Sequence, residues 1–199
     1  MDLDRISTRA AELAASFEVR APRVVAGEVP AWVTERLRCS GRKRQPVLTV
    51  GAGFEDLSAT EQDGALANAI VVGDLVRTGQ AKTALAFGLP FVAVGYPLIV
   101  VAVFQGIPVW AVVSVFAALY VCGHLLTFAL RARRIIYRVD NRVAEVMGRP
   151  VVDVMIDHDI RNHPLLPGLA RLFLAAYSPT VAQRVRRLDT TFGSHRIAG

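Results

Sequence analysis

The feature that most constrains this chain is a segment of 48 residues, 83–130, that contains no Asp, Glu, Lys or Arg. A helix needs about 20 residues to cross the roughly 30 Å apolar core of a bilayer. The segment is long enough for two such helices, which we place at residues 83–104 and 109–130, with a turn at 105–108. Core helices of soluble proteins carry a polar face, but charged residues are absent throughout this segment. The sequence therefore predicts a hairpin of two transmembrane helices.

The charges on either side of this hairpin predict its orientation. The turn is uncharged, whereas Arg77 and Lys82 precede the first helix and four arginines closely follow the second. Positive residues favour the cytoplasmic side of a membrane. We therefore expect both termini in the cytoplasm. Residues 1–82 and 131–199 would then form the two halves of one cytoplasmic domain, with the hairpin at 83–130 between them.

The composition favours a membrane location over nucleic-acid binding. Mean hydropathy is +0.38, and 53% of the residues are apolar. The net charge of +6 comes from residues 131–199, which contain 12 basic and 6 acidic residues. Basic residues next to a membrane span attract anionic headgroups, so we expect the bilayer and other integral membrane proteins as partners, and no nucleic acid. Arginine outnumbers lysine by 21 to 2, which indicates a GC-rich genome and hence a bacterial plasma membrane.

An amphipathic helix is predicted at the N-terminus. Its apolar stripe recurs every three or four residues and includes Leu3, Ile6, Leu13 and Phe17, while charged residues occupy the opposite face. An apolar stripe needs a surface to cover it. This one can pack on the rest of its own domain, lie among lipid headgroups or contact a partner subunit.

A second candidate interaction surface follows the predicted hairpin. The second membrane helix is expected to continue to Met147 and to end at Gly148, with Arg134, Arg138 and Arg142 spaced four residues apart along it. Side chains at this spacing form one edge of a helix. That edge can face solvent or lipid headgroups, or it can bind an acidic partner.

Local signals predict the remaining elements. The sequence Ser58-Ala59-Thr60-Glu61 is a capping box, which starts a helix at Ser58. The β-branched residues between Pro46 and Val50 predict a strand. The other predictions are a short helix from Pro30 through Leu37, a strand at 151–156, a helix at 165–176 and a last helix from Ser178 through Leu188.

The order of these motifs resembles a known family. A strand ending at Gly51 precedes the sequence Leu57-Ser58-Ala59-Thr60-Glu61, and the helix after the hairpin contains Tyr137 and Asp140. Between roughly Val47 and Leu188, the chain resembles the HtpX-type membrane zinc metallopeptidases, relatives of the CaaX prenyl protease. The resemblance implies an α+β membrane protein. Its cytoplasmic domain would be mostly helical and gluzincin-like, with a small sheet, and a two-helix transmembrane hairpin would interrupt it.

The zinc ligands and the catalytic base of that family are missing from this chain. The family has His-Glu-x-x-His after Leu-Ala, where this sequence has Asn68, Ala69 and Val72 at the positions of the first His, the Glu and the second His. Ile136 stands where the third ligand, a Glu, belongs, and Ser178 stands where the family has a further functional His. Two imidazoles one turn apart bind zinc, and the carboxylate between them activates water. The resemblance therefore implies a pseudo-peptidase with no cofactor.

One other cluster contains metal-ligand residue types. Asp157-His158-Asp159 and His163 lie close together in the sequence before Pro164. Such a cluster occurs more often in a solvated turn or a helix cap than in a metal site. His158 and His163 are therefore weak candidates for metal ligands, and no metal is expected.

Three functions are compatible with a scaffold of this kind. The first is a catalytically inactive accessory, stabilising or regulatory subunit of a larger membrane complex, such as an energy-transducing, respiratory or quality-control assembly. The second is an adaptor that binds peptides without cutting them, by strand addition to the edge of the strand from Pro46 to Val50. The third is a membrane zinc metallopeptidase with unusual ligands.

Overall fold

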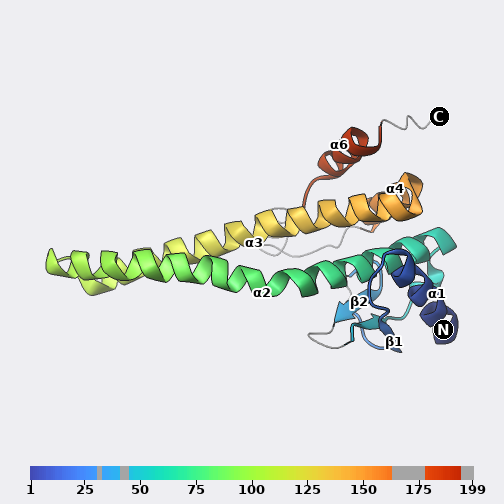
Figure 1. Ribbon diagram of the computed structural model, residues 1–199, viewed down its shortest axis with the longest axis horizontal. Helices are drawn as coiled ribbons and strands as arrows, with labels where there is room; N and C mark the ends of the chain where they lie inside the picture. Colours follow the sequence, from blue (N-terminus) through green and yellow to red (C-terminus); the bar gives the residue numbers. More distant parts are fainter. Residues whose placement is uncertain (31–32, 41–44, 163–177, 194–199) are drawn as a thin grey trace.

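A computed structural model describes residues 1–30, 33–40, 45–162 and 178–193. It is mostly helical and contains a small three-stranded sheet, as the sequence predicted (Figure 1). The N-terminal helix α1, Leu3–Ser16, begins at Asp2, whose side chain accepts a hydrogen bond from the backbone N–H of Arg5 at 3.0 Å. A carboxylate at this position satisfies an N–H group that has no partner within the helix. The apolar stripe of α1 packs on its own domain.

The sheet consists of β1 (Arg23–Ala26), β2 (Leu37–Ser40) and β3 (Val47–Val50) in the order β1-β3-β2. β3 is parallel to β1 and antiparallel to β2. The predicted strand is therefore confirmed, but the predicted helix from Pro30 through Leu37 is wrong over its described residues. Residues 34–36 form a turn and a bend, and Leu37, whose side chain is buried, begins β2. Strand addition to β3 is also excluded, because β1 and β2 pair with both of its edges.

Two long helices, α2 (Ala59–Phe104) and α3 (Val109–Met147), lie antiparallel and side by side in the structure (Figure 1). The capping box at the start of α2 is confirmed, because Ser58 Oγ accepts from the N–H of Glu61, and Glu61 Oε2 accepts from the N–H of Ser58. The side chains of residues 79–96, 98, 99 and 103 in α2 are not described. Gly106, in the turn between the helices, has a φ of +76°, a conformation that glycine adopts without strain.

Among the described residues, α3 is the one helix that is long and apolar enough to cross a membrane. Its most apolar 18-residue window has a mean hydropathy of 2.0, and none of that window is buried. Large apolar side chains such as Trp110 and Leu126 are 74% and 62% exposed. An isolated soluble helix with this surface would bind other apolar surfaces, so the finding favours association with a membrane.

Helix α3 ends at Gly148 as predicted, where a φ of +90° suits glycine. The next residues were predicted as a strand, and that prediction is wrong: they belong to helix α4, Arg149–Arg161. Val152, Met155 and Ile156 are buried, and their spacing of three and four residues is that of a helix face. Pro150 fits the first turn of a helix, where its missing N–H costs nothing.

The last described helix, α6, covers Val181–Phe192 and begins at Thr180 rather than at the predicted Ser178. Thr180 and Gln183 form a capping box there, which explains the later start. The predicted helix at 165–176 lies outside the described residues. One apolar core joins α1, the sheet, the first turns of α2, the end of α3, α4 and α6. Sequence from both sides of residues 83–130 therefore contributes to the same core.

Candidate functional site

The positions that the family resemblance assigns to zinc chemistry lie on α2 and face the protein interior. Asn68 donates a hydrogen bond from its side-chain amide to Oε1 of Glu35, which lies in the turn before β2. Ala69 is 8% exposed and belongs to the apolar core, against which Val72 also packs. Two of these three positions are therefore apolar packing positions, and the third is an amide bonded to a carboxyl group.

The two remaining positions that the resemblance assigns to functional residues, Ile136 and Ser178, lie in different parts of the structure. Ile136 is half-buried on α3, and Ser178 is half-buried in the bend before α6. Their sequence neighbours make the stronger contacts. Tyr137 lies beneath the guanidinium of Arg187, and Asp140 is buried and pairs with Arg184. The residues that match the family pattern thus form structural contacts between α3 and α6.

Arg184 is held between two aspartates from two helices. Its Nε and Nη2 donate to the two oxygens of Asp140 on α3 at 2.8 and 2.7 Å, and its Nη1 donates to Asp159 on α4 at 2.7 Å. The side chains of Arg184 and Asp140 are only 11% and 4% exposed. Burial lowers the pKa of Arg184, but the hydrogen bonds and charges of the two aspartates outweigh it, so the pKa lies above its ordinary value. The arginine therefore stays charged and ties α6 to α3 and α4.

Glu35 is a strongly perturbed acid close to Asn68 and Arg184. Its pKa is raised to about 7, chiefly because its carboxyl group is buried and also because of the negative charge of Asp159, while the hydrogen bond from Asn68 and the charge of Arg184 lower it. The sequence did not single out Glu35, because its environment comes from α2, α4 and α6, which are distant in sequence. An isolated glutamate between Pro30 and Leu37 gives no local signal.

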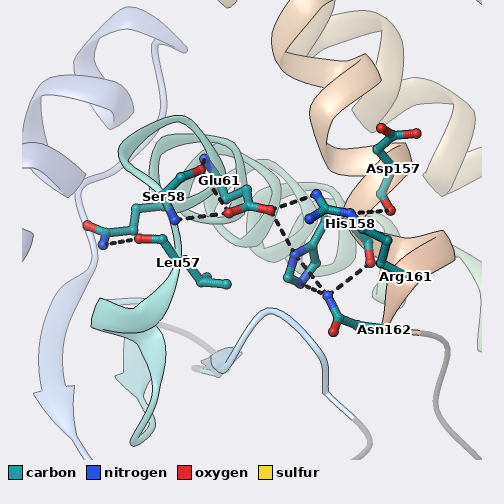
Figure 2. A network of polar contacts seen from close by, with 8 residues as sticks. Leu57, Ser58, Glu61, Asp157, His158, Arg161 and Asn162 are labelled. Carbon is teal, nitrogen blue, oxygen red and sulfur yellow. Dashed lines mark hydrogen bonds and ion pairs between the residues drawn. The ribbon is translucent and has the colours of Figure 1, made fainter.

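A second network joins α2 to α4 through Glu61 (Figure 2). The carboxylate of Glu61 accepts from the N–H and Oγ of Ser58 at 2.9 and 2.7 Å, and from Arg161 on α4 at 2.9 Å. Nδ1 of His158, which is 7% exposed, lies 3.4 Å from Oε1 of Glu61, and Asn162 contacts the same ring. The hydrogen bonds from Ser58 are the largest cause that lowers the pKa of Glu61, to about 2.

Glu61 and His158 are therefore part of a junction that joins α2 to α4. With a pKa of about 2, the carboxylate of Glu61 is ionised near neutral pH and accepts the hydrogen bond from Arg161. A small hollow next to them, with about 240 Å³ of empty space that is open to solvent, is lined by both residues and by Glu35 and Met155. Most of that space is open solvent, and the enclosed part has room for about one water molecule.

Of the two candidate metal ligands, His158 lies in the described part of the chain, on helix α4 between Asp157 and Asp159. In the residues that the structure describes, no group of three or more His, Cys, Asp and Glu side chains is arranged to hold a metal ion. His163 lies outside the described residues.

The candidate interaction residues have different environments. Ile6, Leu13 and Phe17 are 2%, 4% and 2% exposed in the core of their own domain, and Leu3 is half-buried. They are therefore covered by the chain itself, which was one of the three possibilities for the amphipathic stripe.

The predicted basic edge of α3 is divided by the structure. Arg134 and Arg138 are exposed. Arg142 instead donates from Nη2 to the backbone carbonyl of Phe17, and its Nη1 lies 3.9 Å from Asp74 of α2. Because 3.6 residues make one turn, residues four apart drift around the helix, and two such steps bring Arg142 to the neighbours of α3. Arg142 therefore joins α1, α2 and α3 rather than extending the exposed edge.

The raised pKa of Glu35 predicts a pH-dependent stability. Between about pH 4.5 and pH 7 the folded protein keeps a proton that the unfolded chain has lost, so this group destabilises the fold as pH rises through that window. A Glu35→Gln variant keeps the acceptor for Asn68 but does not titrate. We expect it to be more stable than the wild type by about 1 to 3 kcal/mol at pH 8, and by much less at pH 4.5.

Urea unfolding of both proteins between pH 4.5 and pH 8 measures this difference. Glu28, an exposed glutamate before the same turn, supplies the matched control, since a Glu28→Gln variant should follow the wild type throughout. A constant difference between Glu35→Gln and the wild type across the whole pH range would contradict the prediction.

The chain was also compared with protein-family models, with curated proteins and with solved structures, and none of these comparisons gave a match.

Proposed function

We propose that this protein crosses a bacterial plasma membrane twice, through residues 83–104 and 109–130, with both termini in the cytoplasm. The carrying observation is helix α3, whose apolar window has no buried residue and which then continues into the arginine-containing end that packs in the core. A bilayer can cover this apolar surface without disturbing the packing of the cytoplasmic domain, because the apolar window and the packed end are different sections of α3. Because α3 runs antiparallel to α2, which precedes it, α3 returns the chain to the side of the membrane from which α2 came (Figure 1).

We further propose that the cytoplasmic domain is a gluzincin-like pseudo-peptidase. Support comes from the strand, the capping box and the helix that precede Asn68, which have the order found in the HtpX-type peptidases. Ala69 has no carboxylate, and Asn68 is bonded to Glu35. Hydrolysis by zinc-activated water needs two imidazoles and a base at these positions, so this scaffold lacks the chemical groups for it.

A folded membrane scaffold without these groups can still act by binding. We propose that it serves as an accessory subunit that stabilises or regulates a larger membrane complex. The exposed apolar side chains of α3 and its exposed arginines Arg134 and Arg138 are available for this role. The apolar stripe of α1 is not available, because it is buried.

Purification of the tagged full-length protein from its native membranes in a mild detergent tests this function. We expect one or more integral membrane proteins to co-purify in a fixed ratio, measured by mass spectrometry, and no stoichiometric zinc in the same sample. Clients bound in variable, substoichiometric amounts would instead favour a peptide-binding adaptor. A protein that runs alone with one zinc ion per chain would contradict the proposal and favour a peptidase with unusual ligands.

A further inference from the structure

Three exposed arginines gather on one surface where α3 leaves its apolar section. Arg134 and Arg138 lie one turn apart on α3, and Tyr137, three residues after Arg134, is a neighbour of Arg134 on the helix surface. The guanidinium carbon of Arg187, on α6, lies 4.8 Å from the centre of the Tyr137 ring. The cation–π contact holds Arg187 over Tyr137, so α6 adds a third arginine to the section of α3 that carries Arg134 and Arg138. We call Arg134, Arg138 and Arg187 the arginine cluster.

No acidic side chain neutralises the arginine cluster. Every Asp and Glu of the chain lies in the described residues, and the ion pairs among those residues do not include any of these three arginines. The nearest acids in sequence, Asp140 and Asp189, are already bound to Arg184 at 2.7 Å and to Arg149 at 2.6 Å. Other arginines of this domain, such as Arg149, are paired with aspartates. Three unneutralised cations in one place favour an anion as the missing partner.

The position of the cluster indicates which anion this is. Leu130, 52% exposed, is the last residue of the uncharged segment. At 1.5 Å per residue, Arg134 and Arg138 lie about 6 and 12 Å beyond it along α3. The headgroup layer on each side of a bilayer is about 5 to 7 Å thick. Helix side chains tilt toward the N-terminus, which on α3 is the membrane side, so both arginines can reach headgroup phosphates.

We propose that the arginine cluster binds the phosphate group of an anionic lipid in the cytoplasmic leaflet. This inference rests on the proposed insertion of α3 into the membrane. Guanidinium groups suit the site, because each presents planar N–H donors to phosphate oxygens and stays charged at any physiological pH. A lipid in this site would fix the depth of α3 and the position of α6 against it.

Lipid titration of the purified full-length protein, in a neutral detergent and followed by native mass spectrometry, tests the site. Phosphatidylglycerol should bind more tightly than phosphatidylcholine with the same acyl chains. An Arg134→Gln/Arg138→Gln variant should bind phosphatidylglycerol about 30-fold more weakly, and Arg187→Gln about fivefold more weakly, with phosphatidylcholine unaffected. An Arg134→Lys/Arg138→Lys variant should restore most of the binding, which separates loss of charge from misfolding.

The matched control is Arg23→Gln/Arg38→Gln, which removes two exposed arginines from the sheet and should bind both lipids as the wild type does. The inference is overturned if this control loses as much affinity for phosphatidylglycerol as the Arg134→Gln/Arg138→Gln variant does. It is also overturned if the wild type binds phosphatidylglycerol and phosphatidylcholine equally tightly. It is also overturned if inorganic phosphate or hexaglutamate binds the cluster more tightly than the lipid. Extraction of membranes with alkaline carbonate separates the two proposals: release of the wild type refutes membrane insertion, whereas retention without lipid preference refutes only the lipid site.

Discussion

Replacing Arg184 by glutamine is expected to lower the free energy of unfolding by about 3 to 5 kcal/mol. The change removes three short hydrogen bonds and leaves Asp140, which is 4% exposed, as a buried carboxylate without its counter-ion. An uncompensated buried charge is among the most destabilising changes that one substitution can make. The loss can be measured by pulse proteolysis in urea, with the protein in a mild detergent, because that method follows the folded fraction of the cytoplasmic domain.

Two variants control this experiment. Arg186 is exposed on the same helix, so Arg186→Gln removes the same charge and should change stability by no more than about 0.5 kcal/mol. Adding Asp140→Asn to Arg184→Gln removes the unpaired charge and should recover part of the lost stability. The double variant should therefore lose less free energy of unfolding than the sum of the losses of the two single variants. A loss below about 1 kcal/mol for Arg184→Gln would show that α6 is not held to α3 and α4 in this way.

Replacing Phe17 by alanine is expected to cost about 3 to 5 kcal/mol, since a buried phenylalanine loses its transfer free energy and leaves a cavity. Phe17 is 2% exposed at the end of α1, and its backbone carbonyl accepts the hydrogen bond from Arg142 of α3. The same unfolding measurement applies. Phe104 is the matched control, because it is 87% exposed and its replacement by alanine should have little effect on the fold.

The outcome for Phe17 also separates two roles of α1. If α1 packs on the core as the structure has it, then Phe17→Ala must destabilise the whole cytoplasmic domain. A Phe17→Ala protein with unchanged stability would instead mean that the apolar stripe of α1 serves a membrane surface or a partner.

The parts of the fold that were predicted correctly have strong local signals. Ser58 and Glu61 are three residues apart, and the side chain of each accepts a hydrogen bond from the backbone N–H of the other. Gly148 adopts the positive φ that ends α3. The strand at Val47–Val50 is a run of β-branched and apolar residues. These features depend on residues within one or two turns, so the sequence alone contains the information.

The wrong or missing predictions involve contacts between distant segments. The strands β1 and β2 are four residues each, and arginine, cysteine and serine dilute their apolar character, so only pairing with β3 reveals them. The run from Val151 to Ile156 is rich in β-branched residues, which is why a strand was predicted. Its buried residues follow the spacing of a helix face instead, and that spacing is a stronger signal than the residue types.

The contacts of the candidate site could not be predicted from the sequence. The hydrogen bond from Asn68 to Glu35 spans 33 residues, and the bond from Arg184 to Asp140 spans 44. Neither separation has a signature in one sequence. The burial that raises the pKa of Glu35 likewise exists only after α2, α4 and α6 have packed.

The central claim, a two-pass hairpin with both termini in the cytoplasm, is most directly tested by cysteine labelling. The native thiols are first removed as Cys39→Ala and Cys122→Ala. Single cysteines are then placed at Ile107, in the turn between α2 and α3, and at two exposed alanines, Ala15 on α1 and Ala182 on α6.

The probe is a maleimide that cannot cross membranes, applied to spheroplasts before and after lysis. We predict that the cysteine at position 107 reacts before lysis, whereas those at positions 15 and 182 react only afterwards. Reaction of either terminal site before lysis, with the other protected, would mean that the chain crosses the membrane once. That result would contradict the hairpin on which the proposed function depends.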